Sequence, residues 1–174
     1  AFGGSVLVVG PTRQYYDSLL PDFRCTPEAR QRIEQYNIGA YFRRALEGVR
    51  AAAETVIEGW DWETLVDTGD PTSAENNSST IVLFSLDGQR LLFTADAGIP
   101  ALTRAADVLD YLQVPPPSMN FIQVPHHGSR RNVGPTILDR LLGPRLPGDA
   151  KARTAFVSAS QAGLPKHPAK KVTN

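Results

Sequence analysis

The stretch Val124-Pro125-His126-His127-Gly128-Ser129 contains the residues that most strongly indicate the fold and the chemistry of this chain. It follows an apolar run that begins at Phe121, and a glycine comes directly after its two histidines. This pattern predicts a buried strand that ends in a tight turn, with imidazoles at its carboxyl end, where α/β folds place their chemistry. Upstream, the apolar run 91–95 ends at Asp96 in a similar way. A carboxylate and an imidazole at two strand ends predict the beginning of a metal site.

The overall composition is that of an ordinary globular domain. The 174 residues suit one domain, with 41% hydrophobic and 21% charged side chains and a formal net charge of zero. Residues 1–125 carry 9 basic and 16 acidic side chains, whereas residues 126–174 carry 9 and 2. The basic C-terminal part would suit an anionic substrate; the alternative is a solvated surface of lysines and arginines.

Several classes of protein are disfavoured. Cys25 is the single cysteine, which excludes an internal disulfide and a thiolate zinc cluster. No apolar run approaches the length of a membrane span, and the start lacks the pattern of a signal peptide. We therefore expect a soluble protein, with the cytoplasm as the favoured compartment.

Hydrophobic periodicity and turn residues predict a mixed α/β fold. Two apolar runs around Asp87-Gly88 predict a β-hairpin, and Gly98-Ile99-Pro100 predicts a helix start. Residues 59–79, which include Asn76-Asn77-Ser78-Ser79, have the composition of a loop. The expected strands cover 5–9, 80–86, 90–94, 121–124 and 154–158, and the expected helices cover 27–57, 98–114 and 135–141.

The residue types at the two strand ends suit a divalent metal. Asp96 can bridge two metals or orient a bound water, and one of His126 and His127 can supply a nitrogen ligand. The other histidine would then support the site or contact substrate. A metal held in this way would lower the pKa of bound water and deliver hydroxide to an ester or phosphodiester. The alternative is that the histidine pair is incidental to the turn.

The order of these segments resembles the C-terminal half of metallo-β-lactamase-fold hydrolases. It is most similar to the branch that includes the hydrolase-like domain of bacterial DNA-uptake competence proteins. The resemblance implies an αββα sandwich, with residues 1–174 forming one partial domain and a helical insertion at about 13–70. It rests on Asn76-Asn77-Ser78-Ser79, the Asp87-Gly88 hairpin, Phe93-Thr94-Ala95-Asp96, Val124-Pro125-His126-His127-Gly128-Ser129 and His167-Pro168.

The same resemblance implies a two-zinc site. Asp96 would be the bridging carboxylate, and either His126 or His127 would be the last histidine ligand. The family's ligand often precedes a glycine, which favours His127 without deciding the choice. Ser129, His167 and Asn77 would lie on the substrate side, although helix capping around Pro168 is an alternative for His167.

The chain also departs from the family pattern. The main ligand motif, His-x-His-x-Asp-His, is absent, because the only histidines are 126, 127 and 167. Asn76-Asn77 stands in place of a further histidine ligand, and Ala95 replaces the usual glycine before Asp96. We expect the first half of the sandwich and its ligands to lie upstream of Ala1, so that this chain alone binds zinc weakly and hydrolyses little.

Three functions are consistent with these features. The chain could be a fragment of a metal-dependent hydrolase, a module that kept the fold without the metal, or a small nucleic-acid-binding α/β domain. A half sandwich would also expose an apolar sheet face. Formation of a homodimer, or packing of the helices predicted at 27–57, would cover that face.

Overall fold

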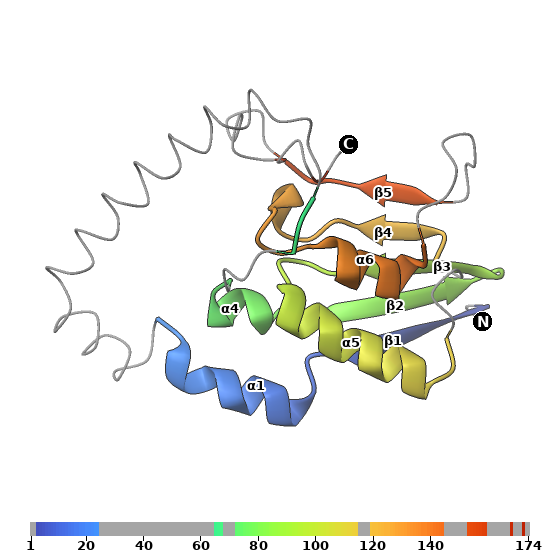
Figure 1. Cartoon of the computed structure of the whole chain (residues 1–174). Coiled ribbons are helices and arrows are strands. Elements are labelled where there is room, and N and C mark those ends of the chain that lie inside the picture. The colour runs from blue at the N-terminus through green and yellow to red at the C-terminus, as the bar shows by residue number, and fades with distance from the viewer. Residues whose placement is uncertain are drawn as a thin grey trace, which may run out of the picture.

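The computed structural model describes residues 3–24, 65–67, 72–114, 119–144, 153–159, 168 and 172. They contain one five-stranded sheet in the order β1-β2-β3-β4-β5 (Figure 1). β1, β2 and β3 are antiparallel neighbours, whereas β4 and β5 run parallel to β3. The predicted mixed α/β class is therefore confirmed. The strands are β1 (Gly4–Gly10), β2 (Ile81–Leu86), β3 (Gln89–Phe93), β4 (Phe121–Gln123) and β5 (Thr154–Phe156).

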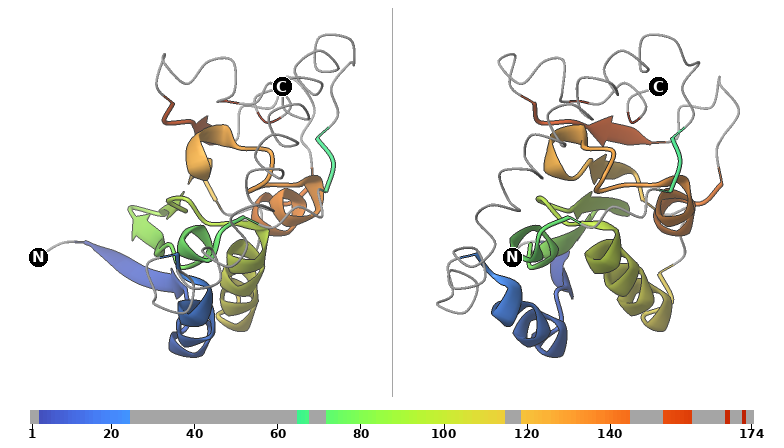
Figure 2. Two further views of the ribbon diagram at one scale, coloured as in Figure 1. Left: turned by 90° about the vertical axis from the view of Figure 1, so that its left-hand side faces the viewer. Right: turned by 60° about the vertical axis from the view of Figure 1, so that its left-hand side comes forward.

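The longer helices α5 and α6 lie on one face of this sheet (Figures 1 and 2). No described helix is both long and apolar enough to cross a membrane. The described helices are α1 (Arg13–Leu19), α4 (Ala74–Asn77), α5 (Ile99–Tyr111) and α6 (Pro135–Leu142), with the 3₁₀ turns η1 (Leu20–Asp22) and η3 (His126–Gly128).

The hairpin predicted around Asp87-Gly88 joins β2 to β3. Asp87 and Gly88 have φ values of 49° and 75°, so both central residues of the turn are left-handed. That conformation matches the right-handed twist of the flanking strands and is favoured by an Asp-Gly pair. Leu86 and Gln89 face each other across the two-residue turn, as a tight hairpin requires.

The core lies between the sheet and α5 and α6. Leu83, Leu92 and Ile122 form a cross-strand row on the covered face, and each is at most 3% exposed. α5 starts after Gly98 with a proline in its first turn, as predicted. Its buried residues include three alanines, whose small side chains let the helix approach the sheet closely: Ala101, Leu102, Ala105, Ala106 and Leu109. The helix ends earlier than the predicted range 98–114, so that Leu112 lies beyond the end of α5 and is 42% exposed.

Polar contacts at both ends attach α6 to the rest of the fold. The backbone N–H and the hydroxyl of Thr136, in the first turn of α6, both donate to the carboxylate of Asp67. This carboxylate therefore caps the helix from a distant part of the sequence. Arg140 donates to Asp110 and Asp107 of α5 at 2.6 Å each, and these hydrogen bonds raise its pKa.

The segments before β2 differ in part from the prediction. The loop expected at 59–79 contains the short helix α4, whose first turn is capped by the Ser73 hydroxyl, which accepts a hydrogen bond from the Asn76 backbone N–H. Residues 13–22, at the start of the predicted helical insertion, are helical in α1 and η1. Three earlier expectations lie outside the described residues: those for the helix at 27–57, for Cys25 and for His167. The described residues form a single sheet; the αββα sandwich that the family resemblance implies remains a prediction.

Candidate functional site

The predicted pair of metal-ligating residue types comes together at the carboxyl ends of β3 and β4. These strands are parallel neighbours, with Leu92 opposite Ile122, so the residues that follow them meet at one edge of the sheet. His126 Nδ1 lies 3.4 Å from Asp96 Oδ2, and the two side chains are 30% and 45% exposed. The pair is therefore reachable from solvent while being held by adjacent strands.

Three of the residues around this pair have unusual backbone conformations. Ala95, His126 and His127 have φ values of 47°, 47° and 56°, in the left-handed region that most side chains avoid. Gly128 continues the turn at 76°. Left-handed non-glycine residues cost roughly 1–2 kcal/mol each, and such strain is concentrated at functional sites. The neighbouring structure must therefore supply the energy that keeps this turn in place.

Hydrogen bonds between the two strand ends supply part of that energy. The His126 N–H donates to the Ala95 carbonyl at 3.0 Å, directly joining the two turns. The buried Thr94 hydroxyl donates to the Gln123 carbonyl at 2.6 Å, and the Ala95 N–H donates to the Gln123 side chain at 3.3 Å. These bonds fix the position of Asp96 relative to His126.

Three polar residues support the pair, and the sequence had singled out only one of them, Asn76. Asn132 is 1% exposed, and its amide donates to the Asp96 carbonyl at 2.9 Å. Asn76 Nδ2 donates to Thr72 Oγ1 at 2.7 Å and lies 3.5 Å from His126 Nδ1. Asn132 thus holds the backbone of Asp96, and Asn76, itself bonded to Thr72, lies beside the imidazole of His126. No sequence signal separates Asn132 or Thr72 from ordinary polar residues.

Asn76, not Asn77, is the asparagine next to the histidine. Asn77 is 6% exposed, and its Oδ1 has no hydrogen-bond partner within the described part of the chain. A Cβ added to Gly98 would lie only 2.6 Å from that oxygen, so the glycine leaves room for the Asn77 side chain. The sequence predicted a loop here, so it could not show that a helical turn directs the two neighbours to different sides.

His127 is oriented differently from His126. Its Nδ1 lies 2.5 Å from the Ser158 carbonyl oxygen, and the two imidazole rings are 5.7 Å apart. A carbonyl partner places the proton on Nδ1, which leaves the lone pair on Nε2. Metal-ligating histidines commonly have such a carbonyl partner. Both histidines therefore retain the chemistry of a ligand, His126 next to Asp96 and His127 on the more exposed side.

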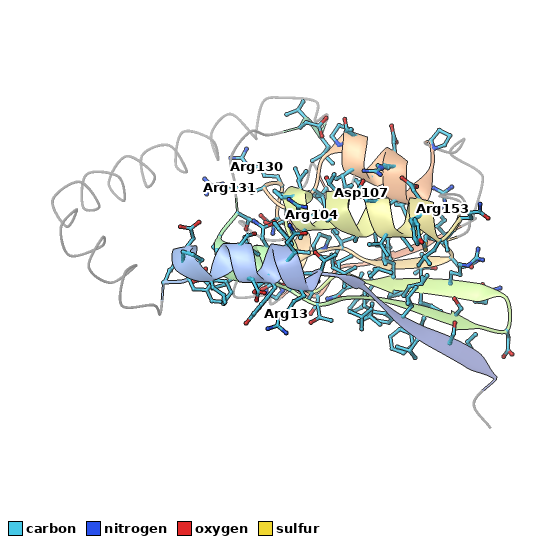
Figure 3. All side chains as sticks on the ribbon, turned by 90° about the horizontal axis from the view of Figure 1, so that it is seen from below. Arg13, Arg104, Asp107, Arg130, Arg131 and Arg153 are labelled. Carbon is cyan, nitrogen blue, oxygen red and sulfur yellow. The ribbon has the colours of Figure 1, made fainter. Side chains whose placement is uncertain are left out.

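Ser129, predicted to face substrate, is turned into the protein. It is 6% exposed, and its hydroxyl accepts a hydrogen bond from the Arg131 N–H at 3.3 Å. This arrangement shapes the loop after the histidines. The two arginines of that loop, Arg130 and Arg131, lie near the end of the sheet where α5 begins, whereas Arg153 lies toward the opposite end (Figure 3). These two arginines are therefore at the same end of the sheet as the Asp96–His126 pair, since Asp96 lies just before α5.

The residues present fit part of a zinc site. Two ligands of one tetrahedral zinc, each about 2.1 Å from the metal, are about 3.4 Å apart, which is the separation of Asp96 Oδ2 and His126 Nδ1. A direct charge-assisted hydrogen bond would be shorter, at about 2.7–2.9 Å. A catalytic zinc needs three protein ligands. The described residues contain no group of three or more His, Cys, Asp or Glu side chains arranged to hold a metal ion.

Comparisons with known proteins identify no relative. The chain matches no protein-family model, and neither curated proteins nor solved structures give a match. The resemblance to metallo-β-lactamase-fold hydrolases therefore remains a prediction based on the motifs of the sequence.

Proposed function

We propose that this chain carries part of the active site of a metal-dependent hydrolase that acts on a phosphodiester or a related anionic ester. The observation that supports this most strongly is the 3.4 Å separation of Asp96 Oδ2 and His126 Nδ1. It suits two ligands of one cation better than a direct hydrogen bond. The strained turns around the pair support the proposal independently, because strain of this kind is concentrated at functional sites.

Each residue then has a defined task. Asp96 and His126 would hold zinc, and His127 would act as a further ligand or contact substrate. A bound zinc ion would act as a Lewis acid and lower the pKa of a coordinated water. Asn132 holds the backbone of Asp96 in position through the hydrogen bond to its carbonyl. The remaining ligands would come from outside the described residues.

The substrate is proposed to be anionic. Arg130 and Arg131 lie three and four residues after His127, and Arg131 is exposed. Guanidinium groups bind the oxygens of phosphate esters in a bidentate manner. A nucleic acid is one polymer that carries such esters.

A second candidate is a module that binds other molecules without catalysis. It is favoured by one observation: the described residues supply fewer than the three ligands that a catalytic zinc requires. In that case Asp96 and His126 would be an ordinary surface ion pair, and zinc would not bind there selectively.

Zinc binding by matched variants separates the two candidates. Dissociation constants would be measured by competition with a fluorescent chelator, and stoichiometry by elemental analysis after dialysis. We expect weak binding by the unmodified chain, and a loss of about tenfold or more in Asp96→Asn and in His126→Ala. The control Asp87→Asn changes a carboxylate in the β2–β3 turn, away from the histidines, and should leave the affinity unchanged.

His127→Ala tests whether the second histidine is also a ligand. A loss as large as that of His126→Ala would give both residues that role, while hydrolysis of a chromogenic phosphodiester by the chain alone should be slight. Equal zinc affinity in the unmodified chain and in Asp96→Asn would refute the metal-site proposal and favour the non-catalytic module.

A further inference from the structure

The face of the sheet opposite α5 and α6 is apolar across all five strands. Cross-strand pairing places Val6, Phe84, Leu91 and Phe121 on this side, and also Val8, Val82 and Phe93. Leu86 on β2 and Phe156 on β5 extend it, because side chains alternate between the two faces along a strand. We call these nine residues the open face.

Aromatic side chains form a continuous row across the open face. The ring centroids of Phe84 and Phe93 are 5.3 Å apart, those of Phe93 and Phe121 are 5.5 Å apart, and those of Phe121 and Phe156 are 6.4 Å apart. The row thus connects β2, β3, β4 and β5. Aromatic rows of this kind contribute strongly to protein cores and interfaces.

Much of this apolar surface is accessible. Val8 is 59% exposed, Val6 55%, Phe156 53%, Leu86 39% and Phe93 36%. On the other side of the same strands, Leu83, Leu92 and Ile122 are almost completely buried. No described helix lies on the open face (Figure 2). The same sheet therefore has one covered face and one face with the composition of a core.

We propose that the open face binds the open face of a second copy of this chain, giving a two-fold symmetric dimer in which two sheets pack face to face. Flat apolar sheet faces pack on each other about 10 Å apart, with their side chains interdigitated. A second copy offers a surface of the same shape and the same aromatic row, as a two-fold interface requires.

The lack of charged residues on the open face favours a second copy of the chain over a partner that is recognised by its charge. The described strand positions on this side carry no Asp, Glu, Lys or Arg; the polar ones, at strand ends, are Gln89, Gln123 and Thr154. An uncharged surface gives no attraction to an acidic or basic partner. It also brings no like charges together when two copies meet.

The area of the open face is sufficient for a specific dimer of low affinity. Five strands about 4.8 Å apart, with lengths of about 10–20 Å, give roughly 500 Å² of accessible surface for each copy. Two copies would bury about 1,000 Å² in total, near the lower limit for a specific interface. We therefore expect a dissociation constant in the micromolar range.

Analytical ultracentrifugation over a wide range of protein concentration tests the dimer. We expect a reversible monomer–dimer equilibrium for the unmodified chain. Phe93→Asp, at the centre of the aromatic row, should raise the dissociation constant about a hundredfold or more, because each substitution occurs twice in a symmetric interface. The control Tyr111→Asp changes an apolar side chain at the end of α5 that is 86% exposed and should leave the equilibrium unchanged.

A milder variant keeps the test valid if Phe93→Asp fails to fold. Val8→Ser changes a side chain that is 59% exposed, so it should preserve the monomer and still weaken the dimer. Three results would overturn the proposal: a folded monomer at the highest concentration, open-ended assembly into larger species, or equal weakening of the dimer by Tyr111→Asp. A folded monomer would instead favour coverage of the open face by residues 27–57 or by the other half of the sandwich that the resemblance implies.

Discussion

On the helix-covered face of the sheet, Leu83, Leu92 and Ile122 are buried in regular strands, whereas the turns that end β3 and β4 hold Ala95, His126 and His127 at positive φ. In the first region, apolar residues are buried and have an ordinary extended backbone. In the second region, non-glycine residues have a left-handed backbone that they disfavour, and hydrogen bonds such as that from Thr94 to Gln123 hold the turns in place. The contrast teaches that local structure and hydrophobic burial agree in the core and conflict at the candidate site, as is expected of functional sites.

The largest effect should come from the covered face. Leu92 is completely buried, so Leu92→Ala would leave a cavity and should lower the free energy of unfolding by about 2–5 kcal/mol. Urea denaturation at a single low protein concentration would measure it. The control Leu86→Ala changes a leucine that is 39% exposed, and should cost less than about 1 kcal/mol. Equal losses would show that the covered face is not the principal core.

The turn after β4 should be the next most sensitive region, and two glycines with nearly the same φ make a matched pair. Gly88 has φ 75° and nothing within 4 Å of an added Cβ. Gly128 has φ 76°, but an added Cβ would lie 2.8 Å from Pro168 Cβ and 3.2 Å from Val157 Cγ1. Gly88→Ala should therefore cost about 1 kcal/mol, from the left-handed backbone alone.

Gly128→Ala should cost more, about 2–3 kcal/mol, because steric crowding adds to the same backbone strain. Thermal unfolding of both variants, followed by circular dichroism, gives the difference directly. If the two variants lose the same stability, the turn after β4 is not tightly packed against Pro168 and Val157. The contrast between the strained site and an ordinary hairpin turn would then disappear.

The sequence predicted the regular parts of the fold because one signal was sufficient for each. Asp87-Gly88 specified the hairpin, and the glycine and proline at 98–100 specified the start of α5. The strands at 121–124 and 154–158 were recognised from their apolar, β-branched or aromatic composition. In these segments local preference, hydrophobic pattern and tertiary packing favour the same structure.

The candidate site could be predicted only in part. Asp96 and the histidine pair were found because they follow apolar strands, but the sequence left the choice of histidine open and slightly favoured His127, whereas His126 lies beside Asp96. The roles of Asn76 and Asn132 depend on contacts across 50 and 36 residues of sequence, which no local pattern encodes. The inward orientation of Ser129 follows from the left-handed turn at His126 and His127, and such a conformation is improbable for any single non-glycine residue.

The smallest effect we predict has the opposite sign and concerns Ala95. At φ 47° a glycine avoids the cost of the left-handed conformation but loses more conformational entropy on folding, so Ala95→Gly should stabilise the fold by up to about 1 kcal/mol. The control Ala97→Gly, two residues away, removes a fully buried methyl group at an ordinary φ and should destabilise it. Thermal unfolding distinguishes a gain in stability from a loss.

If the strain at Ala95 serves to hold Asp96 towards His126, Ala95→Gly should also weaken zinc binding while it raises stability. A variant that is less stable than the unmodified chain would show that the turn after β3 stores no strain, and the contrast with the covered face would then depend on the histidines alone.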